Sequence, residues 1–380
     1  MKELLVSDNV MSSLEPLFST AAKAIRRAVA ESRPVILRYN NDADGICAGL
    51  AIYRALMKLL AERGVTVEGA HRFFRDIQNN SAIYGLGDAM GDILIVRGMS
   101  ELAPLVVLVD FGANIESMDG LKAAKEEKAE IVVIDHHPPF ADALGLIDVF
   151  VSPWAVSGGT SQYCAGLIAG EVAKEMAGVE VSGLQRVAMA GDRSVLQPPS
   201  DELRKKALAL DYLADTVRPR NTLEKCEEVL ADPKRVAEAW GEATRKLAEA
   251  ASEAKQNAKT RELENGFVVV ISDMSKRLKI GLFPPKGKVV GALHDELSAT
   301  EKRPLVTIGK GLDSVTFRAN AAAKAAGFNA SRIIDELKAE WPNAIQSGGG
   351  HDVAASVRMN KGFAKLLLEE AVKKISEIKK

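Results

Sequence analysis

The sequence predicts an α/β protein, with a parallel-sheet N-terminal domain joined by a helical connector to a smaller α/β C-terminal domain. In the first half, short runs rich in Val, Ile or Leu alternate with helical stretches, a pattern typical of a parallel sheet with crossover helices. Residues 223–264 are instead rich in Ala, Glu, Lys and Arg, and strand patterns return after Asn265 and Gly266. We therefore expect domains at residues 1–222 and 265–380, with 223–264 between them.

The first expected element of the N-terminal domain is a strand at residues 35–39, followed by a helix at 46–63. Further strands are expected at residues 65–73, 93–96, 105–109 and 131–134. Near-continuous apolar runs of this kind indicate strands that are buried on both faces. Because ligands bind beyond the carboxyl ends of parallel strands, a site is expected among the residues that directly follow these runs.

The composition of residues 223–264 predicts one or two solvent-facing helices that connect the two domains. In the C-terminal domain, strands are expected at residues 267–271, 289–292, 305–308 and 315–317, and helices at 330–339 and 362–378. This order predicts a second, smaller α/β domain.

The composition excludes several classes of protein. The chain has 380 residues, of which 47% are hydrophobic and 27% charged, so it can bury a core and is not a disordered chain. Lys and Arg number 50 and Asp and Glu 51, so any polyanion must meet a local basic patch. The cysteines Cys47, Cys164 and Cys226 lie far apart without a CxxC pair, which disfavours a zinc ribbon or a disulfide framework and favours the cytoplasm. No signal peptide or membrane span is expected, since no apolar run approaches about 18 residues.

Acidic residues and histidines stand directly after several apolar runs. In the extended segment after the first strand, Asn40, Asp42 and Asp44 would point the same way. Later runs are followed by Asp110, by the triplet Asp135, His136 and His137, and by Asp192.

A single strand-end aspartate can simply cap a helix, and a single histidine can be an ordinary core or surface residue. To explain all of these acids and histidines in this way would require several separate caps and ordinary histidines at once. All of these residues are, however, expected on one edge of one sheet. Carboxylates gathered there repel one another, and cations relieve that repulsion. Oxygen ligands mixed with imidazole suit Mn²⁺ or Mg²⁺, so the set predicts a divalent-cation site.

The order of these motifs, D-x-D-G, a strand-end Asp, D-H-H, a later Asp and a C-terminal G-G-G-H, resembles the DHH phosphoesterase family over nearly the whole chain. The two-domain form is similar to RecJ-like exonucleases, oligonucleotide-degrading nanoRNases and cyclic-dinucleotide phosphodiesterases. The length of the chain and the residues of its motifs are most similar to those of archaeal RecJ-like proteins. Some of those proteins associate with the replication factor GINS. The resemblance implies two divalent cations, Mn²⁺ or alternatively Mg²⁺, that share a hydroxide for attack on a phosphodiester.

Residue by residue, the resemblance implies that Asp42 and Asp110 hold one cation. Asp44, Asp110, His136 and Asp192 would hold the other, so that Asp110 bridges the pair.

The resemblance also implies that His137 contacts the scissile phosphate or a group beside the cations, and that Asp135 orients the histidines. The family usually has histidine where this chain has Asn40. Asn40 could bind one metal weakly, shift the preference toward Mg²⁺, or mark a relative that has lost catalysis. Retained activity is favoured, because the other ligands are all present.

Two features of the C-terminal domain resemble the family's substrate-binding residues. The run Gly348, Gly349, Gly350 and His351 resembles a loop whose backbone N–H groups approach phosphate, although three glycines can also form a simple flexible turn. Arg318 matches the arginine with which the family's second domain holds a substrate phosphate.

Two other segments could meet an anion. Residues 276–288 contain basic residues and no acid, so they form either a basic lip or an ordinary solvated loop. The small-residue loop 157–161 leads into a helix expected to begin near Gln162, whose N-terminus could bind phosphate or be capped by Thr160 or Ser161.

The leading hypothesis is a metal-dependent phosphodiesterase that removes nucleotides from single-stranded DNA, RNA or short oligonucleotides. One alternative is a noncatalytic replication scaffold that binds GINS or another replication protein. A second alternative is a phosphodiesterase for cyclic dinucleotides or bisphosphate nucleotides.

Overall fold

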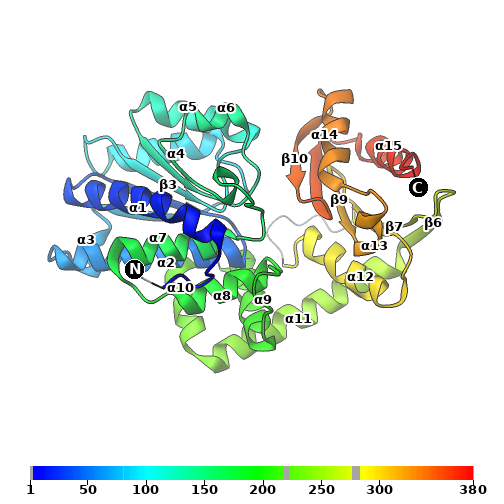
Figure 1. The fold of residues 1–380 in the computed structure, drawn as a ribbon, viewed down its shortest axis with the longest axis horizontal. Helices are drawn as coiled ribbons and strands as arrows, with labels where there is room; N and C mark the ends of the chain where they lie inside the picture. Colours follow the sequence, from blue (N-terminus) through cyan, green and yellow to red (C-terminus); the bar gives the residue numbers. More distant parts are fainter. Residues whose placement is uncertain (1–2, 80, 218–221, 276–282, 380) are drawn as a thin grey trace. The chain divides into compact units, whose positions relative to one another are not determined.

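The computed structural model describes residues 3–79, 81–217, 222–275 and 283–379 (Figure 1). The chain forms two compact units, Met1–Trp240 and Gly241–Lys380, called here the first and second unit. Their boundary falls within helix α11 (Pro233–Gln256). No helix among the described residues combines the length and apolarity needed to cross a bilayer.

The first unit contains a parallel sheet in the strand order β2-β1-β3-β4-β5. Its strands are β1 (Val35–Tyr39), β2 (Phe74–Gln78), β3 (Leu105–Val109), β4 (Glu130–Ile134) and β5 (Val149–Val151). Tyr39 pairs with Val109, and Val109 pairs with Ile134. The carboxyl ends of β1, β3 and β4 therefore lie side by side, and the predicted parallel sheet is confirmed.

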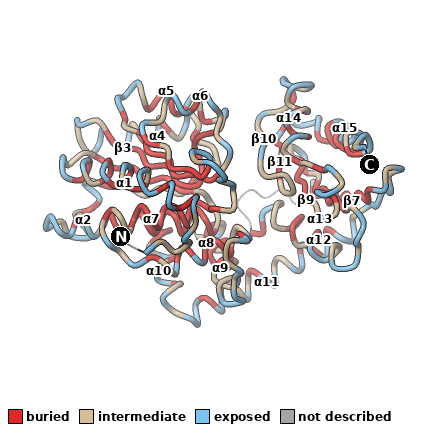
Figure 2. The backbone as a smooth tube through the Cα atoms, in the orientation of Figure 1, coloured by how far each residue is buried: buried red, intermediate tan, exposed pale blue. Residues whose placement is uncertain are grey.

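Helices cover both faces of this sheet, which is why its central strands β1 and β3 are buried (Figure 2). In β1, Leu37 faces a core shared with α1, α2, α7 and α8, whereas its neighbour Ile36 faces a core shared with α4 and α5. This alternation is the two-residue period of a strand. The helices of the first unit are α1 (Asn9–Ala30), α2 (Ala43–Glu62), α3 (Val67–Ala70), α4 (Leu86–Arg97), α5 (Met118–Glu126), α6 (Ala141–Leu144), α7 (Ala165–Ala177), α8 (Ser182–Gly191), α9 (Asp201–Thr216) and α10 (Thr222–Ala231), with the short 3₁₀ helices η1 (Ile115–Ser117) and η2 (Pro153–Ala155).

The second unit contains a mixed sheet in the order β10-β11-β9-β8-β7-β6, in which β7 and β8 are parallel and the other neighbours antiparallel. Helices α14 and α15 pack on one face of this sheet, and α12 packs with the end of α11 in a separate core. The elements are β6 (Ala258–Glu262), β7 (Val268–Asp273), α12 (Lys286–Thr300), β8 (Leu305–Lys310), β9 (Ser314–Ala319), α13 (Ala321–Ala325), α14 (Ala330–Glu340), β10 (Ile345–Gly350), β11 (Ala354–Met359) and α15 (Ala364–Ser376).

Three predicted strands are wrong. Residues 93–96 lie in α4 and residues 289–292 in α12, because a short apolar run does not distinguish a helix from a strand. Residues 65–73 contain the short helix α3, whose first turn is capped by Thr66, and the strand begins only at Phe74. The positions of ten further elements were not predicted: α1, α5, α6, α8, α9, α13, β5, β6, β10 and β11.

The residues predicted as a connector, 223–264, are divided between the two units. Leu223 and Cys226 of α10 are buried in the core of the first unit, as is Val236 of α11. Ala250 and Ala254, later in α11, are buried in the second unit. The predicted helices exist, but each also contributes to a core.

Candidate metal centre

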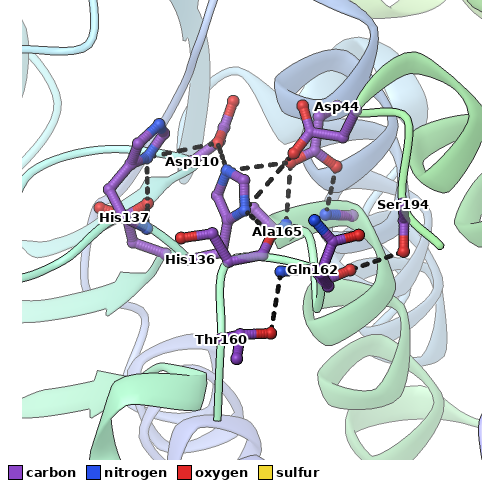
Figure 3. A network of polar contacts seen from close by, with 12 residues as sticks. Asp44, Asp110, His136, His137, Thr160, Gln162, Ala165 and Ser194 are labelled. Carbon is purple, nitrogen blue, oxygen red and sulfur yellow. Dashed lines mark hydrogen bonds and ion pairs between the residues drawn. The ribbon is translucent and has the colours of Figure 1, made fainter. Parts of the chain in front are cut away.

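The polar residues predicted from the strand ends gather at the carboxyl edge of the parallel sheet. Because β1, β3 and β4 end side by side, the residues that follow Tyr39, Val109 and Ile134 come together in space. Figure 3 shows Asp44 and Asp110 directed toward His136, with His137 beside them. The remaining acid, Asp192, lies at the end of α8, where it is the C-cap residue.

Asp44 lies in the first turn of α2 and is almost fully buried. Its Oδ2 accepts a hydrogen bond from the backbone nitrogen of Ala165, and its Oδ1 accepts one from Gly166, both at 2.8 Å. These are the first residues of α7, whose own N-cap residue, Cys164, provides no side-chain hydrogen bond. Asp44 therefore caps α7 from a distant part of the chain, and the helix dipole stabilises its negative charge.

The predicted helix start near Gln162 is wrong, and so is its proposed capping. Helix α7 begins at Ala165, and the N–H groups of its first residues bind Asp44 instead of Thr160 or Ser161. A carboxylate already occupies the N–H groups of Ala165 and Gly166, so these two donors do not offer a phosphate site.

Asp42 is the N-cap residue of α2, and its Oδ1 accepts a hydrogen bond from the backbone nitrogen of Gly45 at 2.9 Å. The side-chain nitrogen of Asn40 donates to Oδ2 of Asp42 at 2.9 Å and to Oδ2 of Asp110 at 3.0 Å. A Cβ atom at position 45 would lie 2.5 Å from the carbonyl oxygen of Asn40, so glycine is required there. One neutral amide thus links two carboxylates.

Asp110 follows β3 in a left-handed backbone conformation, with φ of 66°. This conformation is unfavourable for most residues and is tolerated better by Asp. Burial, together with the charges of Asp42 and Asp44, raises the pKa of Asp110 well above its ordinary value. Its buried Oδ1 makes no hydrogen bond of ordinary geometry with the described residues, and Nε2 of His136 lies 3.3 Å from it. A buried carboxylate oxygen without such a hydrogen bond is where a bound cation is expected.

His136 is buried, and its Nδ1 lies 2.8 Å from the carbonyl oxygen of Ser161. A carbonyl only accepts hydrogen bonds, so Nδ1 carries a proton and Nε2 is directed toward Oδ1 of Asp110 at 3.3 Å. Burial alone would lower the pKa of His136, but the carboxylates of Asp192, Asp110 and Asp44 raise it well above 6.5. A cation at Nε2 would take the place of the second proton.

Asp135 orients the second histidine. Its Oδ1 accepts hydrogen bonds from the backbone nitrogen of His137 at 3.1 Å and from Nδ1 of the same residue at 2.8 Å. Burial alone would raise the pKa of Asp135, but the adjacent His137 outweighs that effect and lowers it. Asp135 therefore stays ionised, and it fixes the imidazole ring of His137 in place.

Asp192 completes the cluster, with Oδ2 at 3.4 Å from Nδ1 of His136. Burial raises the pKa of Asp192 to about 7; His136 opposes this effect, and the charges of Asp44 and Asp42 add to it. The loop that carries Asp192 is held by Ser194, whose hydroxyl donates to the carbonyl oxygen of Gln162 at 2.7 Å (Figure 3).

Two groups of side chains in the first unit bring possible ligand atoms within 4.8 Å of one another. One is Asp44, His136 and Asp192, and the other is Asp110, Asp135, His136 and His137. Asp42 belongs to neither of these two groups. Carboxylate oxygens combined with imidazole nitrogen suit a divalent cation such as Mn²⁺, so the donor set fits the predicted metal.

Helix α9 supports the cluster in a way that sequence reasoning missed. Oδ1 of Asp211 accepts a hydrogen bond from the backbone nitrogen of Ala43, and Oδ1 of Asp215 accepts one from the side chain of Asn41, both at 3.0 Å. These contacts hold the segment between β1 and α2. Ala43 and Asp211 are 168 residues apart, so no local pattern reveals the contact.

In the second unit, the predicted phosphate ligand Arg318 lies on β9. Its Nη1 donates to the carbonyl oxygen of Phe317 at 2.8 Å, and its Nη2 donates to that of Gly287, in the first turn of α12, at 3.3 Å. Of the predicted basic lip, residues 276–282 lie outside the described residues. Lys286 forms an ion pair with Asp313 at 3.4 Å.

The glycines predicted as a loop belong to strand β10 instead. Gly348 to Gly350 pair with β11, and His351 begins the turn between the two strands. Gly350 has φ of 136°, and a Cβ atom there would lie 2.5 Å from the carbonyl oxygen of Ala354. At Gly349 an added Cβ atom would have no neighbour within 4 Å. Gly350 thus allows the backbone to pack closely against β11, whereas Gly349 leaves open space beside the backbone.

Residues 34–189 match the sequence profile described as the DHH family, N-terminal domain. An uncharacterised protein of Methanocaldococcus jannaschii is 27% identical over 424 aligned residues, which cover 99% of this chain and 56% of the relative. The chain thus spans a little over half the length of that curated relative.

Solved structures share the fold. The DHH domain of a protein described as a member of a ribosomal protein family is 29% identical with a TM-score of 0.90, and the match covers 100% of this chain and 94% of that domain. RecJ from Thermus thermophilus in complex with Mn²⁺ has a TM-score of 0.60 at 16% identity, over 95% of this chain and 55% of RecJ. CDC45 from Entamoeba histolytica has a TM-score of 0.55 at 10% identity, over 96% and 99% of the two chains.

Proposed function

We propose that this protein is a metal-dependent phosphodiesterase, because residues 34–189 match the DHH-family profile and the chain shares its fold with RecJ. Its substrates would be single-stranded DNA, RNA or short oligonucleotides, from which it removes nucleotides. The observation that carries the proposal is the gathering of carboxylates and His136 around the buried Oδ1 of Asp110, which makes no hydrogen bond of ordinary geometry with the described residues.

Asp44, Asp110, His136 and Asp192 would hold a divalent cation, with Asp42 beside them. Mn²⁺ is the first choice and Mg²⁺ the alternative, since both accept carboxylate oxygens and Mn²⁺ also suits imidazole. When bound, such a cation supplies the positive charge that activates a water and neutralises the reacting phosphate. The hydrogen bonds from α7 to Asp44 and from His136 to Ser161 would fix the ligands before the cation arrives.

His137 would act on the substrate itself. Its side chain is 32% exposed, whereas that of Asp135 behind it is only 3% exposed. Because Nδ1 donates to Asp135, the nitrogen of a neutral His137 ring that can accept a proton or a hydrogen bond is Nε2. The pair would therefore position Nε2 of His137 against a phosphate oxygen and exchange a proton there.

The second unit would contribute a phosphate-binding surface of its own. A guanidinium matches phosphate geometry, so Arg318 would hold a phosphate, together with His351 and the backbone of Gly348 to Gly350. The open position at Gly349 supports this role, because a substrate could approach the backbone there without meeting a side chain.

The test uses single-stranded DNA and RNA labelled at either end, incubated with Mn²⁺, Mg²⁺ or EDTA. We expect metal-dependent shortening of the strands by the wild type and loss of about a hundredfold or more in Asp135→Ala. Asp142→Ala is the matched control, because Asp142 is an exposed aspartate in α6. Cleavage by Asp135→Ala at the wild-type rate would overturn the assignment.

Asn40 favours one second candidate, a noncatalytic scaffold that binds a replication protein such as GINS. Its amide donates to one oxygen each of Asp42 and Asp110 without any cation. Calorimetry would detect no binding of Mn²⁺ to such a scaffold, which would still form a complex with its partner. If Mn²⁺ binds but no strand is cut, cyclic dinucleotides and bisphosphate nucleotides are the next substrates to assay.

A further inference from the structure

Asn40 places a hydrogen-bond donor between two carboxylates of the proposed metal centre. We propose that, without substrate, this protein binds one divalent cation tightly and not two, because the Asn40 amide occupies the place of the second. The inference rests on the proposed metal-dependent function and specifies the metal content of that same site.

The orientation of the amide follows from the charges around it. The two carboxylate oxygens that it faces belong to Asp42 and Asp110, at 2.9 and 3.0 Å from its nitrogen. An amide oxygen turned toward them would be repelled, whereas the two N–H hydrogens are attracted to both. The neutral side chain of Asn40 therefore relieves the repulsion that a cation would otherwise relieve.

The same contacts weaken the binding of a second cation. Both oxygens of Asp42 already accept a hydrogen bond, Oδ1 from Gly45 and Oδ2 from Asn40. A cation placed where the Asn40 amide lies, between Oδ2 of Asp42 and Oδ2 of Asp110, would have to break both hydrogen bonds of Asn40 and turn its amide over. In exchange it would gain only a neutral oxygen ligand, which transition metals prefer less than imidazole.

The other side of Asp110 offers a contrast. Oδ1 of Asp110 makes no hydrogen bond of ordinary geometry with the described residues, and Nε2 of His136 lies 3.3 Å from it. Asp44 and Asp192 contribute further carboxylate oxygens to the same group as His136. Asp110 would thus bind the tight cation through Oδ1 and Asn40 through Oδ2, so in the substrate-free protein it does not bridge two cations.

The experiment counts bound Mn²⁺ by native mass spectrometry and calorimetry after removal of metal with EDTA. We expect one tight Mn²⁺ in the wild type and a second that binds at least about tenfold more weakly. Asn40→His, which supplies an imidazole, and Asn40→Asp, which supplies a carboxylate, should each bind two Mn²⁺ tightly. The use of two different replacements keeps the test decisive if one variant fails to fold.

Asn257→His is the matched control, because Asn257 is exposed in the second unit, where its side chain donates to the carbonyl oxygen of Glu253. Its Mn²⁺ content should stay at one. Two Mn²⁺ of similar affinity in the wild type, or one tight Mn²⁺ in both folded Asn40 variants, would overturn the inference and leave the phosphodiesterase proposal intact. If the wild type bound no Mn²⁺ at all, both proposals would fail.

Discussion

Oδ1 of Asp44 lies 2.8 Å from the backbone nitrogen of Gly166, the second residue of α7. The carboxylate proposed as a metal ligand is therefore also the cap of a buried helix. Packing of α7 against α2 thus sets where this ligand points, and a change in that packing should reach the metal centre.

Gly166→Ala should weaken both folding and metal binding. An added Cβ atom would lie 2.4 Å from Cβ of Ala188 and 2.9 Å from Oδ1 of Asp44, so the helices must separate or the carboxylate must move. We expect a loss of about 1–3 kcal/mol in the free energy of unfolding, measured by urea denaturation, together with weaker Mn²⁺ binding in calorimetry. Gly183→Ala is the control, since a Cβ atom at position 183 of α8 meets nothing within 4 Å. Equal effects of the two substitutions would contradict this explanation.

Asp211→Ala should impair activity although Asp211 lies outside the metal centre. The substitution leaves the N–H of Ala43 without its carboxylate partner, which costs about 1–3 kcal/mol of stability for a buried donor. Because Ala43 lies between Asp42 and Asp44, we also expect weaker Mn²⁺ binding. Asp201→Ala, at the exposed start of the same helix, should change stability by less than about 1 kcal/mol. Thermal unfolding and Mn²⁺ titration of both variants check this, and unchanged Mn²⁺ affinity in Asp211→Ala would refute the supporting role.

The metal-free protein should lose stability as the pH rises. The pKa of Asp192 is about 7 in the folded protein against 3.8 ordinarily, so the folded state holds this proton more strongly than the unfolded state. The stability linked to that proton is complete below about pH 4 and is lost as the pH rises through 7. In EDTA, the wild type should therefore lose on the order of 1 kcal/mol more than Asp192→Asn between pH 5 and 8. Denaturation curves that run parallel for the two proteins would argue against this linkage.

Asp110→Asn should stabilise the metal-free protein while it removes the response to metal. Burial and the nearby Asp42 and Asp44 make an ionised Asp110 unfavourable, and the left-handed backbone at this position tolerates asparagine. The new amide could still accept a hydrogen bond from Asn40 through its oxygen. We expect a gain on the order of 1 kcal/mol at pH 8 in EDTA, with no further gain on addition of Mn²⁺. Asp142→Asn serves as control, and a destabilised Asp110→Asn would contradict the prediction.

The parts of the centre that follow buried strands were predictable from the sequence. A parallel sheet places the ends of β1, β3 and β4 together, so the acids that follow them meet, as the register of Tyr39, Val109 and Ile134 confirms. The chemistry of the cluster then follows from the types of residue gathered there.

The contacts that hold this cluster were not predictable. Asp44 caps a helix that begins 121 residues later in the chain, and Asp211 binds a backbone nitrogen 168 residues away. Because both pairs are far apart in the sequence, no local sequence pattern predicts either contact. The apolar runs in α4 and α12 were wrongly predicted as strands, because four consecutive apolar residues do not show whether hydrophobicity repeats with the period of a helix or of a strand. Leu94, in the first of these runs, is 68% exposed on the surface of α4.

The most direct test of the metal-dependent function is the rate at which EDTA-treated protein shortens a single-stranded oligonucleotide as Mn²⁺ is added. We predict no cleavage before Mn²⁺ is added, a saturable rise in rate as it binds, and a rate lower by roughly a hundredfold or more in Asp110→Ala. Cleavage that proceeds equally in EDTA, or equally in Asp110→Ala, would contradict a metal-dependent function.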